Sequence, residues 1–231
     1  MKIGIIGTGN IGGNLTRSLR KLGHEVAIAN SRGPETLSGL AAETGAIPVT
    51  VKEAAKGRDL VVITIPEAHI KDLPKDLFAG AGNDLVVVDT GNYYPRNRDG
   101  RIAGIEDGLT ESEWVEKELG RPVIKTFNTI YAAHILSNAK PKGAPGRLAL
   151  PVAGDHRKHK EIVMNLVDQM GFDPVDAGPL TQSWRQQPDT PVYGKDLDAE
   201  ATRRGLAAAS PERKPEWRAT DKSPGTFEHP A

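Results

Sequence analysis

Three glycines near the start of the chain have the spacing of a phosphate-binding turn. Gly7, Gly9 and Gly12 follow an apolar run over residues 2–6 and open a helical pattern over residues 10–22. In this context the first glycine permits a tight turn, the second lets the backbone approach a pyrophosphate, and the third lets the helix lie against the strand. The N–H groups and positive dipole end of the helix face the bound anion. We therefore predict a dinucleotide site made by Gly7, Thr8, Gly9, Asn10, Ile11 and Gly12.

The residues after the second expected strand, 25–29, indicate which dinucleotide binds. An NAD site usually has an Asp or Glu about twenty residues past the glycines, where it accepts hydrogen bonds from the ribose hydroxyls. This chain has Asn30, Ser31 and Arg32 there, with Thr36 shortly after. Hydroxyls and a guanidinium hold a 2′-phosphate by charge-assisted hydrogen bonds, so the sequence favours NADP(H) over NAD(H). Arg-Gly-Pro after a strand is also ordinary turn chemistry, which is the alternative interpretation of Arg32.

Other candidate contacts follow the later strands, because ligands of an open parallel sheet bind outside the carboxyl ends of its strands. Ile65 and Pro66 end a buried apolar run and are expected to flank the middle of the cofactor, with His69 just beyond. Asn128 and Thr129 end a later strand, where a nicotinamide would reach. Either side chain suits a carboxamide partner, and the alternative is a turn that only terminates the strand.

No side chain is assigned as the catalytic acid or base. Tyr131 and His134 are the candidates for a proton donor beside a reacting carbonyl or imine, although a structural histidine is the commoner case. His156 and His159 are spaced like a metal pair but lie in His-Arg-Lys-His-Lys, where three cations would repel a metal. We therefore expect an exposed helix start there and no metal site.

Missing motifs narrow the chemistry further. The sequence has no Tyr-x-x-x-Lys proton relay, no Gly-x-x-x-x-Gly-Lys-Ser/Thr loop for ATP, and no Gly-x-Ser-x-Gly nucleophile elbow. This favours an acceptor that takes a hydride with little help, as a flavin-like ring does, because the cofactors then carry the difficult chemistry.

Composition excludes several classes of protein. The 231 residues contain 30 Lys plus Arg and 30 Asp plus Glu, so no overall field attracts nucleic acid or a membrane surface. Cysteine is absent, which removes disulfides, thiolate chemistry and cysteine-ligated zinc. No apolar run approaches a membrane span, and the chain starts directly with a core strand. We expect a cytoplasmic protein with a small-molecule substrate.

Alternating apolar strands and helical patterns predict an α/β fold with a doubly wound parallel (Rossmann) sheet and extra carboxyl-terminal strands. Strands are expected over residues 2–6, 25–29, 47–50, 59–65, 84–89, 122–127, 147–153 and 173–177, the last two at the far edge of the sheet. Helices are expected over residues 10–22, 35–44, 51–56, 68–78, 112–119, 131–139, 157–170 and 196–209, with Ser112 as a cap and a loop over residues 90–110.

The composition changes past Gly178. We place a dinucleotide-binding domain at residues 1–180, with acceptor-site elements in 125–180, and a proline-rich arm at residues 181–231. A floppy tail is one interpretation. Trp184 and Trp217 argue against it, because large aromatic side chains are poor choices for a segment that never packs. We expect an extended arm that wraps the body or a neighbouring subunit, which favours a homodimer.

Five separated blocks resemble bacterial members of the NADP oxidoreductase, coenzyme F420-dependent family. They are Gly7 to Gly13, Asn30 to Leu37, Lys125 to Ile130, Leu150 to Asp155 and Gly171 to Leu180. The resemblance covers residues 1–180 and implies an NADPH site with Ser31 and Arg32 on the 2′-phosphate. It also implies a deazaflavin ring stacked on the nicotinamide near Asn128 and residues 150–155. The extended tail departs from the compact archaeal members.

Three functions are consistent with these observations. The first is hydride transfer between NADPH and a deazaflavin, coenzyme F420, or a flavin. Coenzyme F420 carries a phosphate and a glutamate tail, so its site should offer cations, and the candidates are Lys125, Arg147 and Arg185. The second is NADPH-dependent reduction of a small carbonyl or imine, with Tyr131 or His134 as the acid. The third is a dinucleotide-binding sensor or subunit without turnover.

Overall fold

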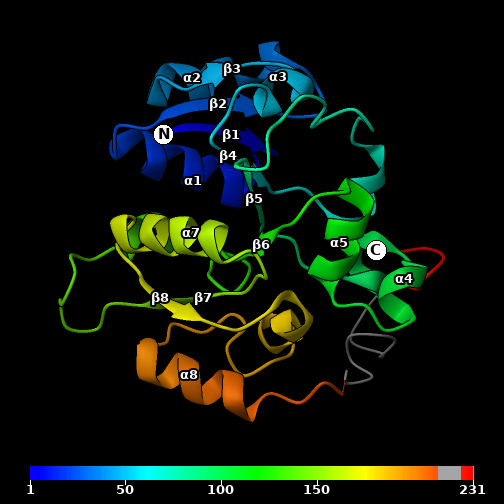
Figure 1. Ribbon diagram of the computed structural model, residues 1–231, viewed down its shortest axis with the longest axis vertical. Helices are drawn as coiled ribbons and strands as arrows, with labels where there is room; N and C mark the ends of the chain where they lie inside the picture. Colours follow the sequence, from blue (N-terminus) through cyan, green and yellow to red (C-terminus); the bar gives the residue numbers. More distant parts are fainter. Residues whose placement is uncertain (213–224, 231) are drawn as a thin grey trace.

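A computed structural model of the chain describes residues 1–212 and 225–230 (Figure 1). Its parallel sheet has six strands in the order β3-β2-β1-β4-β5-β6. The strands are β1 (Lys2–Ile6), β2 (Glu25–Ala29), β3 (Ile47–Pro48), β4 (Leu60–Ile63), β5 (Val86–Asp89) and β6 (Ile124–Lys125). This order reverses between β1 and β4, which is the switch point of a Rossmann fold. The predicted doubly wound sheet is therefore confirmed.

Apolar side chains on both faces of the sheet hold the helices against it. On one face, Ile3, Ile5 and Val62 pack with α1 (Asn10–Lys21) and α7 (Arg157–Gln169). On the other, Val61 and Val87 pack with α3 (Val51–Ala55) and α5 (Glu111–Leu119). Because β4 and β5 are buried on both faces, their sequences are continuous apolar runs.

The remaining helical elements are short. They are η1 (Pro34–Leu37), α2 (Ser38–Thr44), η2 (Glu67–Asp72), η3 (Pro95–Asp99), α4 (Ala103–Glu106), α6 (His134–Ser137), η4 (Leu180–Gln186) and α8 (Ala199–Ala208). The helix predicted over 68–78 ends early because Pro74 holds Leu73 in an extended conformation. The loop predicted over 90–110 contains η3 and α4, so that prediction was too simple.

The cap of α5 differs from the prediction. Thr110, not Ser112, is the N-cap: its hydroxyl accepts a hydrogen bond from the Glu113 N–H at 3.1 Å, and Glu113 accepts one from the Thr110 N–H at 2.9 Å. This reciprocal pair satisfies two N–H groups that the helix itself leaves unpaired. Ser112 is buried and donates to Asp89 at 2.7 Å.

Two further strands, β7 (Ala149–Val152) and β8 (Asp173–Asp176), follow β6 in the chain. They form a separate parallel pair rather than the edge of the main sheet that we predicted. Lys125 and Ala153 join the pair to β6 through an antiparallel bridge, with N–H to oxygen distances of 2.8 and 3.0 Å. Helix α7 lies between this pair and the main sheet, and α8 covers the opposite face (Figure 1).

The arm packs on the body over residues 181–212. Val192 and Leu206 are buried against Ala149 and Val175 of the β7–β8 pair. The backbone N–H of Ala149 donates to Leu197 at 2.8 Å. Trp217, which we used to argue for a packed arm, lies outside the described residues. In the part of the chain that is described, no helix is both long and apolar enough for a membrane span.

Candidate functional site

A groove runs along the carboxyl edge of the sheet, from the turn after β1 to the arm. Its lining comes from the segments that follow β1, β4, β5 and β6 and from the arm: Gly9, Asn10, Ile11, Thr64, Ile65, Pro66, Thr90, Gly91, Asn92, Tyr94, Arg98, Phe127, Asn128, Ile130, Tyr131, Ala132 and Tyr193. The groove therefore crosses the switch point, which is where a doubly wound sheet binds its ligand.

The glycine turn has the geometry that a pyrophosphate site needs. Gly7 has a φ of 103°, and a Cβ there would lie 2.1 Å from the Thr64 oxygen. A Cβ on Gly12 would lie 2.0 Å from the Gly7 oxygen, so both positions exclude a side chain for structural reasons. Gly9 differs, because a Cβ there meets no heavy atom within 4 Å. Only at Gly9, among the three, does the missing side chain leave open space above the start of α1.

The turn after β2 gathers the residues predicted to hold a 2′-phosphate. The Asn30 amide donates to the Thr36 hydroxyl at 2.9 Å, and its oxygen accepts the Arg32 N–H at 2.9 Å. Ser31 and Arg32 are exposed, and Arg32 has no ion pair within the described chain. Asn30 thus shapes the turn, while a hydroxyl and a guanidinium remain directed to solvent. Glu35 lies beside Gly33 and is the nearest carboxylate in sequence.

Asn128, just after β6, is hydrogen-bonded to the segment after β5 and to the arm. Its amide donates to Asn92 Oδ1 at 3.1 Å and to the Gln186 oxygen at 2.6 Å, while its own Oδ1 accepts from Gln186 Nε2 at 2.9 Å. Both amide hydrogens are therefore used inside the protein, which leaves only the remaining lone pair of Oδ1 for a ligand. Thr129 is buried, and its carbonyl accepts the Gly194 N–H at 2.9 Å.

The other predicted contacts lie at different distances from the groove. Ile65, Pro66 and Tyr131 line it. His69 is exposed on η2, where it pairs with Asp72 at 2.8 Å, and is not among the lining residues. His134 also lies outside the lining, paired with Asp196 of the arm at 2.9 Å. Tyr131 is therefore the proton-donor candidate that reaches the groove.

Two of the cations expected to hold an acceptor tail are buried in ion pairs. Lys125 is fully buried, and Arg147 is bonded to Asp168 and Asp173 beside β8. Neither lines the groove, where Arg98 is the one cationic side chain among the described residues. Residues 150–154 are likewise buried beneath the arm rather than in the groove. The third expected cation, Arg185, lies over the ring of its neighbour Trp184.

The predicted exposed histidines also need correction. His156 does cap the start of α7, as its Nδ1 accepts the His159 N–H at 3.4 Å. His159 is buried, however, with its ring stacked on His156 at 3.8 Å and its Nε2 3.0 Å from the Asn83 oxygen. Burial lowers the pKa of His159.

A buried charge cluster lies directly behind the groove. Asp89 and Lys125 are register partners on β5 and β6, with 3.1 Å between the ammonium and the carboxylate. Lys125 also donates to the Gly91 oxygen at 2.6 Å, and Glu111 lies 3.8 Å from it. Burial acts to lower the pKa of Lys125, but Asp89 and Glu111 outweigh it and raise that pKa. The ammonium thus holds the Gly91 turn of the groove in place.

Glu67 adds a buried acid to this cluster. The side chain is fully buried, and neither oxygen has a hydrogen-bond partner within the described chain. Burial, followed by the nearby Asp89 carboxylate, raises the pKa of Glu67 well above its usual range. A Cβ on Gly91 would lie 2.2 Å from Glu67 Oε1, so the glycine gives the acid its space. The fold therefore keeps the Glu67 proton to a higher pH than the unfolded chain does.

Replacing Glu67 by glutamine is expected to stabilise the fold increasingly as the pH rises. In the wild type the unfolded chain ionises at Glu67 near pH 4.3, while the folded chain keeps the proton, so stability falls as pH rises toward the raised pKa. Glutamine has no such titration, so the difference in unfolding free energy should widen by about 1.4 kcal/mol per pH unit in that window. Urea unfolding of both proteins at several pH values measures it, and a difference independent of pH would show that Glu67 is ionised in the fold.

A family model matches the amino-terminal part of the chain. The model of the family described as NADP oxidoreductase, coenzyme F420-dependent, matches residues 2–93, which contain the glycine turn and the turn after β2. The match covers less than half of the chain. The predicted resemblance is therefore confirmed over residues 2–93, and the match supports an oxidoreductase that uses a nicotinamide dinucleotide.

Solved structures extend the likeness beyond residue 93. A protein of unassigned function from Sinorhizobium meliloti, SMa0349, is 31% identical, with a TM-score of 0.72 over 85% of this chain and 95% of the other. A candidate F420-dependent NADP reductase from Arthrobacter sp. FB24 is 24% identical, with a TM-score of 0.64 over 79% and 87%. The second likeness shows the shared fold.

A shorter match links the chain to Escherichia coli YjhV, which is 47% identical over 72 residues. That match covers 31% of this chain and 53% of YjhV. Another joins it to the mitochondrial 3-hydroxyisobutyrate dehydrogenase of Drosophila melanogaster, 30% identical over 95 residues, or 40% of this chain and 29% of that protein. The chain thus spans about half, or less, of these curated relatives.

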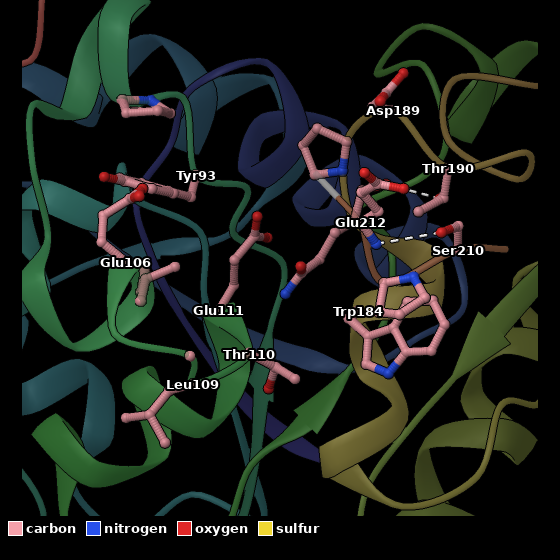
Figure 2. A pocket seen from close by; sticks show the side chains of 16 residues that line it. Tyr93, Glu106, Leu109, Thr110, Glu111, Trp184, Asp189, Thr190, Ser210 and Glu212 are labelled. Atoms are coloured by element: carbon pink, nitrogen blue, oxygen red, sulfur yellow. Dashed lines mark hydrogen bonds between the residues drawn. The ribbon is translucent and has the colours of Figure 1, made fainter. Parts of the chain in front are cut away.

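A second cavity of the protein lies between α4, α5 and the arm. Figure 2 shows Tyr93 and Glu106 on one side of it, Trp184 and Glu212 on the other, and Glu111 between them. The described lining contains four carboxylates, from Glu106, Glu111, Asp189 and Glu212, and no lysine or arginine. None of these residues belongs to the glycine turn or to the end of β2. The groove at the switch point is therefore the better match for an anionic dinucleotide.

Proposed function

We propose that the protein is an NADPH-dependent oxidoreductase that transfers a hydride between NADPH and a deazaflavin, such as coenzyme F420, or a flavin. The observation that carries this proposal is an open glycine turn at the switch point next to a β2 end that has Ser31 and Arg32 in place of an acid. NADPH would lie with its pyrophosphate over Gly9 and its nicotinamide toward the ends of β5 and β6.

The character of the groove supports a ring acceptor. Its described lining contains no Asp, Glu, His or Lys side chain, so it offers no dedicated acid–base pair. In the proposed step the C4–H bond of the nicotinamide breaks, and its hydrogen and electron pair form a new bond on the acceptor ring. The nicotinamide is oxidised, and a proton from solvent completes the reduced ring. The protein supplies proximity and orientation, which suffice for this chemistry.

Reduction of a small carbonyl or imine is a second candidate, favoured by Tyr131. This phenol lines the groove and is 57% exposed, so it is accessible as a proton donor. Spectrophotometric assays of NADPH oxidation with deazaflavin, flavin, aldehyde and imine acceptors separate the two functions, with NADH as the control. NADPH binding without oxidation by any acceptor would instead indicate a sensor. A cytoplasmic location and a homodimer stay predictions from the sequence.

Replacing Arg32 by alanine is expected to weaken NADPH binding by one to two decades while leaving NADH binding nearly unchanged. The loss corresponds to a charge-assisted hydrogen bond, which contributes about 1.5–3 kcal/mol. Fluorescence titration of each nucleotide measures the two affinities. Arg157 is an exposed arginine on α7 outside the groove, and Arg157→Ala should change neither affinity. Equal weakening of NADPH and NADH by Arg32→Ala would rule out the phosphate role.

A further inference from the structure

Three of the four tyrosines in the chain line the groove. Tyr94 follows β5, Tyr131 follows β6, and Tyr193 belongs to the arm. The Tyr94 and Tyr193 hydroxyls are hydrogen-bonded to each other. Phenol rings from three separate segments thus form one wall of the groove, the tyrosine wall.

The arm is fixed at the position from which Tyr193 reaches the groove. Before Tyr193, the fully buried Gln186 exchanges two hydrogen bonds with Asn128. After it, the Gly194 N–H donates to the Thr129 carbonyl at 2.9 Å. Both anchors lie on the segment that follows β6, so the arm and the end of the sheet form one rigid wall. Tyr193 is held in place before any ligand binds.

The tyrosine wall has the character of a stacking surface. Tyr131 remains 57% exposed although Gly194 passes close to its hydroxyl, where a Cβ would lie 3.4 Å away. The Arg98 guanidinium lies 4.9 Å from the centre of the Tyr94 ring, on the same wall. The Arg98 charge is compensated by the buried Asp99 carboxylate at 2.9 Å. The exposed face of Tyr131 gains free energy by packing against another flat ring.

We propose that the arm builds the acceptor half of the groove, and that the acceptor is a flat conjugated ring that packs against Tyr131 and Tyr193. This inference rests on the proposed function and adds to it the residues that select the acceptor. Tyr193 is a specificity-determining residue in this arrangement, because a small aliphatic carbonyl would leave the phenol faces uncovered. The carboxyl-terminal arm is therefore part of the binding site rather than an appendage.

Binding of riboflavin and deazariboflavin to the NADP⁺-loaded protein tests this inference without requiring turnover. Stacking on a phenol should quench ring fluorescence, and a titration gives the affinity. We expect Tyr131→Ala and Tyr193→Ala each to weaken ring binding about tenfold, while Tyr193→Phe, which keeps the ring, stays within about twofold. Leu136→Ala, an exposed apolar residue of α6 outside the groove, is the matched control and should have no effect.

NADP⁺ affinity, measured in the same variants, distinguishes a failure of the proposed function from a failure of this inference. It should fall less than the ring affinity, because every variant keeps the glycine turn and Arg32, the proposed contacts of the pyrophosphate and the 2′-phosphate. Absence of NADP⁺ binding in the wild type would contradict the proposed function. Normal NADP⁺ binding together with no ring binding, or with equal ring affinity in wild type and both alanine variants, would overturn this inference. Tyr131 is exposed, so its alanine variant remains informative even if Tyr193→Ala loosens the arm.

Discussion

Replacing Lys125 by methionine is expected to lower the free energy of unfolding by about 3–5 kcal/mol, because it leaves buried carboxylates without their counter-ion. Lys125 is fully buried, 3.1 Å from Asp89 and 3.8 Å from Glu111. Methionine has nearly the same length and no polar group to bury, so the loss reports on charge rather than on a cavity. Urea unfolding at neutral pH measures the change.

Two further variants test this explanation. Lys142 is 81% exposed in its pair with Asp168, and Lys142→Met should change stability by less than about 0.5 kcal/mol. Adding Asp89→Asn to Lys125→Met should recover part of the loss, because it removes one of the uncompensated charges. A small effect of Lys125→Met, or no recovery in the double variant, would show that the cluster does not depend on its ammonium.

The fold was predictable because its signals are local. The glycine turn needs three residues in a row of six, and the buried strands need only a continuous apolar run, as in Leu60–Ile63. The prediction of the α5 cap was wrong because two residues close in sequence could each serve as the N-cap. Thr110 and Ser112 are both good caps, and the choice fell to Thr110 because a glutamate stands three residues after it.

The candidate site was predictable only in part, because half of it depends on contacts between distant segments. The phosphate end is made by short stretches after β1 and β2, which the sequence shows directly. The tyrosine wall requires a hydrogen bond between Tyr193 and Tyr94, which are 99 positions apart. It also requires one between Gln186 and Asn128, which are 58 positions apart. No periodic pattern in the sequence predicts these contacts. One signal could have revealed the buried cluster, since Asp89 and Lys125 each extend an otherwise apolar strand.

Replacing Gly9 by alanine is expected to weaken NADPH binding by about two decades without harming the fold. Gly9 has φ and ψ of −69° and −160°, which any residue adopts, and a Cβ there meets no protein atom within 4 Å. The methyl group would instead occupy the space proposed for the pyrophosphate and lengthen its hydrogen bonds to the start of α1, which contribute about 1.5–3 kcal/mol each. Thermal unfolding and NADPH titration of the same variant separate the two effects.

Two other glycines provide the comparison that decides this prediction. Gly39, in α2, also has open space around it, and Gly39→Ala should stabilise the fold by about 0.5–1 kcal/mol with unchanged NADPH affinity. Gly12→Ala should unfold the protein at lower temperature, because its Cβ meets the Gly7 oxygen at 2.0 Å. Weak binding in Gly9→Ala with a normal melting temperature would therefore reflect the ligand alone. If Gly9→Ala binds NADPH as the wild type does, the pyrophosphate does not lie over the turn.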